Sequence, residues 1–154
     1  MPNITPFLWF DTQAEDAAKF YVSLFPNSKI SRICQRMEAA PANASNILMV
    51  EFELNGERYL ALNGGPQIKF TEAVSLMVHC KTQQEIDRYW TALTADGGEE
   101  GVCGWLKDKY GLSWQIVPEV ITELLAGRDR AKANRVMAAV MNMKKLDLAL
   151  LEQI

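Results

Sequence analysis

The sequence predicts an α+β protein built from two copies of one strand-helix-strand-strand-strand module. Three observations support this: a composition that can fill a core, a repeat at a fixed spacing, and a strong hairpin signal. Of the 154 residues, 49% are apolar and 23% are charged, which is typical of a globular chain and too apolar for a disordered one. We therefore expect a single domain over residues 1–154, with modules at 1–66 and 72–118 and a helical tail at 119–154.

The first module shows both helical and strand periodicity. Aromatic and branched residues predict an opening buried strand, and apolar residues at three- and four-residue spacing then predict a helix that Asp11 or Thr12 caps. Asn55-Gly56 separates two alternating runs and is the preferred type I′ hairpin turn, because both central residues need positive φ. In order, we expect a strand at 4–10, a helix at 14–25, a strand at 28–36, a loop at 37–46 and strands at 46–54 and 57–63.

The second module repeats this order. A shift of 69 positions places Asp11 on Cys80, Ala17 on Ile86 and Leu24 on Leu93, so that strand falls on strand and helix on helix. The turn at 108–111 predicts a second hairpin, with Lys107 to Lys109 exposed to solvent. In order, we expect a strand at 73–80, a helix at 82–95, a short strand at 98–101 and strands at 102–107 and 112–118.

The segment after Pro118 has helical spacing throughout. Val120 and Leu124 belong to a short amphipathic helix that Gly127 ends. A second helix places its apolar residues, two methionines among them, on one face. Asp147 can cap a last helical turn.

Charge and composition limit the possible partners and the compartment. The chain has 16 Lys and Arg against 19 Asp and Glu, a net charge of −3, and this balance argues against binding to nucleic acid. We find no membrane-spanning run and no secretory signal, and we expect a cytoplasmic protein. Cys34, Cys80 and Cys103 form no metal-binding or disulfide pattern and are expected to be buried thiols in a reducing compartment.

Five strings of the sequence are typical of one known family. They are ITPFLWFD at 4–11, AAKFY at 17–21, LALNGGP at 60–66, QEIDRYW at 84–90 and CGWLKDKYGLSWQIVP at 103–118. With these strings the chain resembles the PhnB-like branch of the vicinal oxygen chelate (glyoxalase/bleomycin resistance) superfamily, whose members often carry the label 3-demethylubiquinone-9 3-methyltransferase. This resemblance implies that the two modules form a cup-shaped, mainly antiparallel eight-stranded sheet with outer helices and a ligand inside, and that the protein is a homodimer.

The positions that hold a metal in superfamily enzymes carry weak ligands in this chain. The first strand supplies neither imidazole nor carboxylate, and its partner strand supplies only Asn63. The second module supplies Ser75, His79 and Gln115, the last where the family pattern has a glutamate. Neutral amides and hydroxyls bind divalent ions poorly compared with carboxylates and imidazoles. We therefore expect neither a catalytic metal nor another cofactor.

The leading hypothesis is a protein that binds a small apolar or aromatic molecule in the cup. Strand alternation suggests which side chains face that molecule, with Trp9 turned toward the helices. The expected apolar lining is Leu8, Phe10, Met77 and Trp105, and the expected polar contacts are Asn63, Ser75, His79 and Gln115.

The sequence also allows two other functions. In a metal-independent enzyme, His79, the only histidine, would be the catalytic residue and move a proton. A methyltransferase would agree with the family label. However, Gly64-Gly65-Pro66 does not open a helix in the way that a nucleotide-binding glycine loop does.

Overall fold

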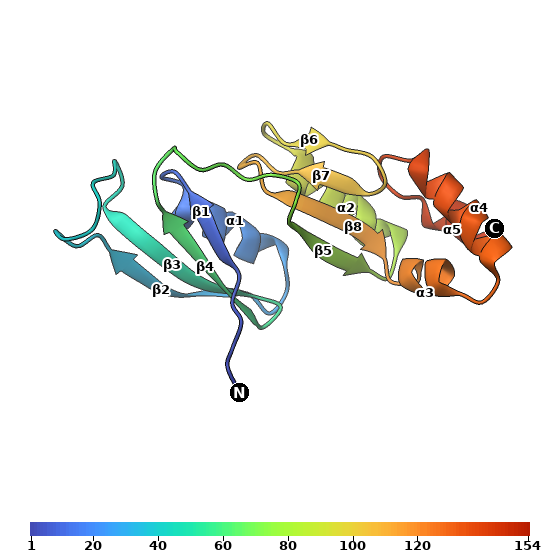
Figure 1. Ribbon diagram of the computed structural model, residues 1–154, viewed down its shortest axis with the longest axis horizontal. Coiled ribbons are helices and arrows are strands. Elements are labelled where there is room, and N and C mark those ends of the chain that lie inside the picture. The colour runs from blue at the N-terminus through green and yellow to red at the C-terminus, as the bar shows by residue number, and fades with distance from the viewer. The chain divides into compact units, whose positions relative to one another are not determined.

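The computed structural model describes residues 1–154 and divides into two compact units, Met1–Phe70 and Thr71–Ile154 (Figure 1). The first unit contains a four-stranded sheet with the strand order β1-β4-β3-β2, in which β1 runs parallel to β4 and the other pairs are antiparallel. Its elements are β1 (Phe7–Phe10), α1 (Ala14–Leu24), β2 (Lys29–Gln35), β3 (Ile47–Leu54) and β4 (Glu57–Asn63).

The second unit has the same arrangement, with the strand order β5-β8-β7-β6 and the same single parallel pair, β5 with β8. The α+β class and the tandem repeat are thus confirmed. The eight strands form two open four-stranded sheets, and β6 is only two residues long. The elements are β5 (Ser75–Cys80), α2 (Gln83–Thr94), β6 (Glu99–Glu100), β7 (Trp105–Lys107) and β8 (Ser113–Pro118), followed by α3 (Ile121–Ala126), α4 (Arg130–Met141) and α5 (Leu148–Glu152).

The β3–β4 hairpin has the predicted turn. Asn55 and Gly56 both have positive φ, at 50° and 84°, and Leu54 pairs with Glu57 across the turn. This is the backbone that a two-residue type I′ turn requires, and asparagine and glycine adopt it at low cost.

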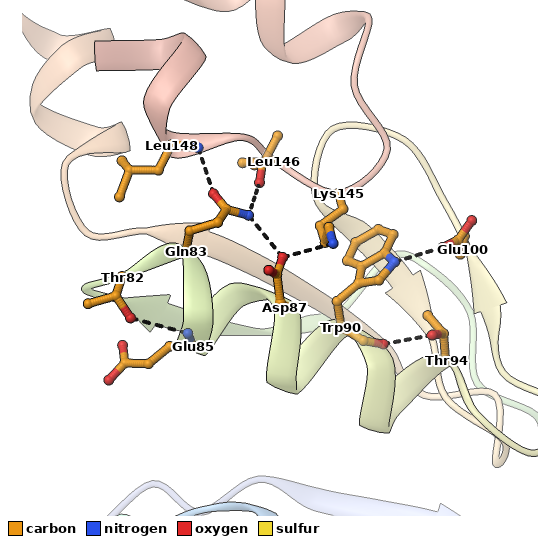
Figure 2. Close-up of polar contacts among 10 residues, drawn as sticks. All are labelled: Thr82, Gln83, Glu85, Asp87, Trp90, Thr94, Glu100, Lys145, Leu146 and Leu148. Atoms are coloured by element: carbon orange, nitrogen blue, oxygen red, sulfur yellow. Dashed lines mark hydrogen bonds and ion pairs between the residues drawn. The ribbon is translucent and has the colours of Figure 1, made fainter.

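The two equivalent helices begin in different ways. Thr82 is the N-cap residue of α2, and its hydroxyl accepts a hydrogen bond from Glu85 N at 3.2 Å (Figure 2). The prediction that Asp11 or Thr12 caps α1 is wrong. Gln13 is the N-cap residue of α1 without a side-chain cap, and the acceptor for Ala14 N is the amide oxygen of Asn63, which comes from β4.

Each sheet has one face covered by its helix (Figure 1). In the first unit, buried Val50 and Phe52 of β3 lie on the face toward α1, and the Phe52 ring is 6.3 Å from that of Tyr21. In the second unit, Leu106, Trp114 and Ile116 are buried on the face toward α2. The residues that alternate with these along each strand therefore lie on the opposite face, away from the helices.

The tail helices form a core of their own at the end of β8. Ala133, Val136 and Val140 of α4 are buried, whereas Met137 and Met141 on the same helix are exposed. None of the helices combines the length and apolar character needed to cross a membrane. The buried residues of this core are Val117, Ile121, Val136, Val140, Leu146 and Leu151.

The β7–β8 turn is organised by a buried carboxylate, contrary to the prediction of a fully exposed turn. Asp108 is only 2% exposed. It accepts hydrogen bonds from Tyr110 N and Leu112 N, and its second oxygen accepts one from Trp114 Nε1 at 2.9 Å. These bonds hold the turn to β8 and satisfy the indole N–H of a buried tryptophan.

Candidate functional site

Leu8 and Phe10 of β1 lie on the helix-covered face of the first sheet. In the strand register, Leu8 is beside Ala61 and Phe10 beside Asn63, and all four residues are buried. Trp9 has the opposite orientation, and its indole N–H donates to Gly65 O at 3.0 Å. The expected facing of β1 is therefore reversed: Leu8 and Phe10 contribute to the core, and Trp9 lies on the other face.

The Trp9 ring explains the glycine pair after β4. A Cβ atom on Gly64 would lie 2.4 Å from the Trp9 ring, so only glycine leaves room for the indole. Residues 64–74 contain no helix. The glycines thus accommodate a neighbouring side chain in this fold.

Asn63 is fully engaged within the protein. It is 1% exposed, and its amide oxygen accepts from Ala14 N at 2.8 Å. Its amide nitrogen donates to Ser45 Oγ and to Ile47 O, both at 3.0 Å. Asn63 therefore holds together the start of α1, the end of β4 and the loop before β3.

The remaining predicted residues gather on the face of the second sheet that is turned away from α2. Two rows cross the strands β5, β8 and β7: Met77, Gln115 and Trp105 are register neighbours in one, and Ser75, Ser113 and Lys107 in the next. We call these six residues, together with His79, the open face of the second unit. Met77 is 45% exposed, and Gln115 and Trp105 are half-buried.

Hydrogen bonding orients the amide at the centre of the open face. Gln115 Nε2 donates to Ser75 Oγ at 2.9 Å, from the middle strand β8 to the edge strand β5. The amide oxygen of Gln115 and one of its N–H groups make no hydrogen bond within the protein. An oriented amide with free donor and acceptor positions between Met77 and Trp105 can recognise a polar atom on an otherwise apolar molecule.

His79 lies farther along β5, is exposed, and is the register neighbour of Val117. It makes no hydrogen bond or ion pair. An imidazole that acts as a general base is ordinarily oriented by a carboxylate or carbonyl on its second nitrogen. The structure supplies no such partner to His79.

The donor set of the open face is a poor match for the metal that superfamily enzymes use. Ser75 and Gln115 are neutral and bonded to each other, and Asn63 of the first unit is used within the core. No group of three or more His, Cys, Asp or Glu side chains is placed to hold one ion. Divalent ions favour charged oxygens, imidazole or thiolate, so these residues do not fit such an ion.

The sequence interpretation missed three residues of this region. Ser113 and Lys107 alternate with Trp114 and Leu106, so the strand period used for Gln115 would also have placed them on the open face. Glu72, which forms an ion pair with Lys107 at 2.6 Å, precedes β5 and gave no sequence signal.

A separate cavity of about 360 Å³ lies among the tail helices. None of the predicted site residues contributes to it. Its lining mixes apolar and charged residues: Val120, Glu123, Leu124, Gly127, Asp129, Lys132 and Glu152.

Comparisons with known proteins identify the family. The sequence model of the 3-demethylubiquinone-9 3-methyltransferase family matches residues 2–117. None of the curated proteins compared with this chain matches it. A PhnB protein from Bacillus cereus is 35% identical, with a TM-score of 0.69 over 76% of this chain and 99% of its own.

More distant structures share the fold. A protein from Pseudomonas aeruginosa has 17% identity and a TM-score of 0.65, over 77% of this chain and 98% of its own. The fosfomycin resistance protein FosX from Listeria monocytogenes has 12% identity and a TM-score of 0.52, over 77% of this chain and 93% of its own. By the match over residues 2–117, the chain belongs to the 3-demethylubiquinone-9 3-methyltransferase family, the PhnB-like branch of proteins with the glyoxalase/bleomycin resistance fold.

Proposed function

We propose that this protein binds a small, partly apolar molecule on the open face of the second unit, without a catalytic metal. One observation carries the proposal: Gln115, oriented by Ser75, lies in one row with exposed Met77 and half-buried Trp105. Methionine and tryptophan provide adaptable apolar contact, and an oriented amide provides specificity. The proposed ligand contacts are Ser75, Met77, Trp105 and Gln115. His79 lies beyond Met77 on the same face of β5.

Binding is favoured over turnover by the chemistry of these residues. His79 has no orienting partner, and the groups beside Gln115 are a hydroxyl, a thioether and an indole, none of which is a base. Stabilising a developing charge needs donors aimed at one point, with a base within reach. An amide and a hydroxyl that bond to each other are suited to ligand recognition.

The methyltransferase in the family description is not the function that we favour. Enzymes that hold a nucleotide-like cofactor on a glycine loop place that loop at the start of a helix. Gly64 instead accommodates the Trp9 ring, and residues 64–74 contain no helix. We expect no saturable binding of S-adenosylmethionine at millimolar concentration.

Dye binding tests the proposal with a matched pair of variants. Met77 and Met137 are similarly exposed, at 45% and 43%, but only Met77 belongs to the open face. Replacing Met77 with arginine places a charge in the apolar row, and we expect the affinity for the neutral dye Nile red to fall about tenfold. Met137→Arg should leave it unchanged. Equal affinity in both variants and the wild type would overturn the proposal.

Native mass spectrometry gives an independent reading and tests the subunit number, which we propose to be two. Protein purified without chelator or added metal should give a dimer that is free of a stoichiometric divalent ion. A retained organic adduct that is lost in Met77→Arg would identify the ligand. A near-stoichiometric metal ion would contradict the metal-free proposal.

A further inference from the structure

Ser113 has a buried hydroxyl group without a partner. The residue is 1% exposed, and its Oγ atom is the one buried side-chain nitrogen or oxygen that makes no hydrogen bond. Burying a polar group without a partner destabilises a protein, so such groups are rare and call for an explanation. Ser113 lies on the open face beside Ser75 of β5 and Lys107 of β7.

The neighbour of Ser113 on β7 forms an ion pair. Lys107 Nζ is 2.6 Å from Glu72 Oε1. Lys107 belongs to β7, and Glu72 lies three residues before Ser75 of β5. Lys107 is the register neighbour of Ser113 on β7, so this ion pair begins at the residue beside the unpartnered hydroxyl.

The carboxylate of Glu72 is held by Lys107 and by a hydrogen bond from its own backbone N–H. Hydrogen bonding to Lys107 lowers the pKa of the Glu72 carboxyl group, and the same contact raises the pKa of the Lys107 ammonium group. The Glu72 side chain is 62% exposed and belongs to the irregular segment between the two units' strands. Exposed ion pairs of this kind contribute little net free energy and exchange readily with other partners.

We propose that Lys107 and Ser113 form a subsite for the carboxylate of a small organic acid, and that Glu72 occupies this subsite in the free protein. The inference rests on the proposed function, since the apolar body of the acid would lie on Met77 and Trp105. The carboxylate would displace Glu72, accept hydrogen bonds from Lys107 Nζ and the Ser113 hydroxyl, and lie next to the Ser75–Gln115 pair. The group already paired with Lys107 is a carboxylate, which shows that the position accepts one.

The remaining charge near this position is Glu99. It is the register neighbour of Lys107 on β6, is exposed, and raises the pKa of Lys107 through a weaker attraction than that of Glu72, without forming an ion pair. Lys107 is the only charged residue among the six residues of the two rows, so its ammonium group is left without an ion pair when Glu72 moves away. The open face thus has a positive end on β7 and a neutral, apolar centre.

Two compounds that share a naphthalene ring test the subsite: 2-naphthoate, which carries a carboxylate, and the neutral 2-naphthalenemethanol. Each is titrated into the full-length protein, and its affinity is measured from NMR chemical shifts. Replacing Glu72 with glutamine removes the competing carboxylate, so we expect the affinity for 2-naphthoate to rise about threefold. Lys107→Gln should lower it about tenfold. Neither change should alter the affinity for the alcohol by more than about twofold. Glu57→Gln, which removes the same charge from the first unit, serves as the control.

Ser113→Ala distinguishes recognition from folding. This variant removes an unpartnered buried hydroxyl, so it should fold at least as stably as the wild type while binding 2-naphthoate more weakly. A Glu72→Gln protein that binds both probes as the wild type does would overturn the inference, as would a failure of 2-naphthoate to bind while Nile red still binds. Loss of the difference between Met77→Arg and Met137→Arg would instead overturn the proposed function.

Discussion

Asn63 shows how a single side chain can connect three segments. Its amide oxygen accepts a hydrogen bond from Ala14 N in the first turn of α1, and its amide nitrogen donates to Ser45 Oγ and Ile47 O. Asparagine is suited to this role because one planar group both accepts and donates. The arrangement replaces the side-chain cap that α1 lacks.

We expect Asn63→Ala to destabilise the protein by about 2–4 kcal/mol, because Ala14 N and Ile47 O lose their partners. Urea unfolding at fixed temperature measures the change. Asn134→Ala, an exposed position on α4, should alter the free energy of unfolding by no more than about 0.5 kcal/mol. Unchanged stability in Asn63→Ala would show that the side chain is available to a ligand.

Cys80 illustrates how burial controls a titratable group. It is 1% exposed at the end of β5, whereas Cys34 and Cys103, which were also predicted to be buried, are only half-buried. Burial, with smaller contributions from Glu85 and Glu119, raises the pKa of the Cys80 thiol from 9.0 to about 12. The thiolate, not the thiol, reacts with disulfide reagents.

Cys34 and Cys103 should therefore react with a disulfide reagent at pH 8, and Cys80 should react only after unfolding. The unfolded chain releases the Cys80 proton above about pH 9 while the folded chain retains it, so this residue's contribution to stability is complete below pH 9 and declines toward pH 12. Unfolding of the wild type and Cys80→Ala between pH 7 and pH 10 measures the difference. A third thiol that reacts rapidly in the folded protein would contradict the expected burial.

At the scale of elements, α2 holds the segment between α4 and α5. Gln83 at the start of α2 donates to Leu146 O at 3.0 Å and accepts from Leu148 N at 2.8 Å (Figure 2). The same amide also donates to Asp87, whose carboxylate forms an ion pair with Lys145 at 2.8 Å. One face of α2 thus fixes the path of the chain into α5.

Replacing Gln83 with alanine should destabilise the protein by about 1–3 kcal/mol, because Leu148 N and Leu146 O lose their partners. Amide hydrogen exchange should become faster over residues 143–152. The neighbouring residue, Gln84, is exposed and offers a matched control, so Gln84→Ala should retain the exchange pattern of the wild type. Equal exchange in both variants would show that the apolar core alone holds the segment.

At the scale of the whole molecule, the tail lies outside the family match yet shares a core with β8. The family model ends at residue 117, whereas five of the six buried residues of the tail core follow it. The tail also accepts backbone hydrogen bonds, from Cys103 N to Met143 O and from Gly104 N to Lys144 O, both at 2.8 Å. The second unit therefore depends on a segment that the family pattern does not include.

A chain truncated after residue 118 should lose protection in the second unit. Val117 would be exposed, and Cys103 and Gly104 would lose their acceptors. Hydrogen exchange should become faster in β7 and β8, with peptides from β3 and β4 of the first unit as the internal reference. Unchanged exchange in β8 would show that the sheet is stable without the tail core.

The sequence by itself determined the tandem modules, the Asn55-Gly56 hairpin, the positions of both long helices and the family. Periodicity and turn chemistry are local, so they can be seen in one chain segment at a time. Alternation along a strand shows which residues share a face, but it does not show which face the helix covers. In β1 the indole of Trp9 packs over Gly64 on the uncovered face, and Leu8 and Phe10 are buried on the face toward α1.

Only the tertiary structure decided which polar residues remain available on the sheet faces. Asn63 and Gln115 were equivalent as sequence candidates, yet Asn63 is consumed by the start of α1 while Gln115 is oriented by Ser75 on the open face. Asp108 is buried, and Glu72 reaches Lys107 from the irregular segment before β5. Hydrogen bonds and ion pairs between distant segments depend on strand order and register, which are set when the sheet assembles and are not encoded in any single stretch of residues.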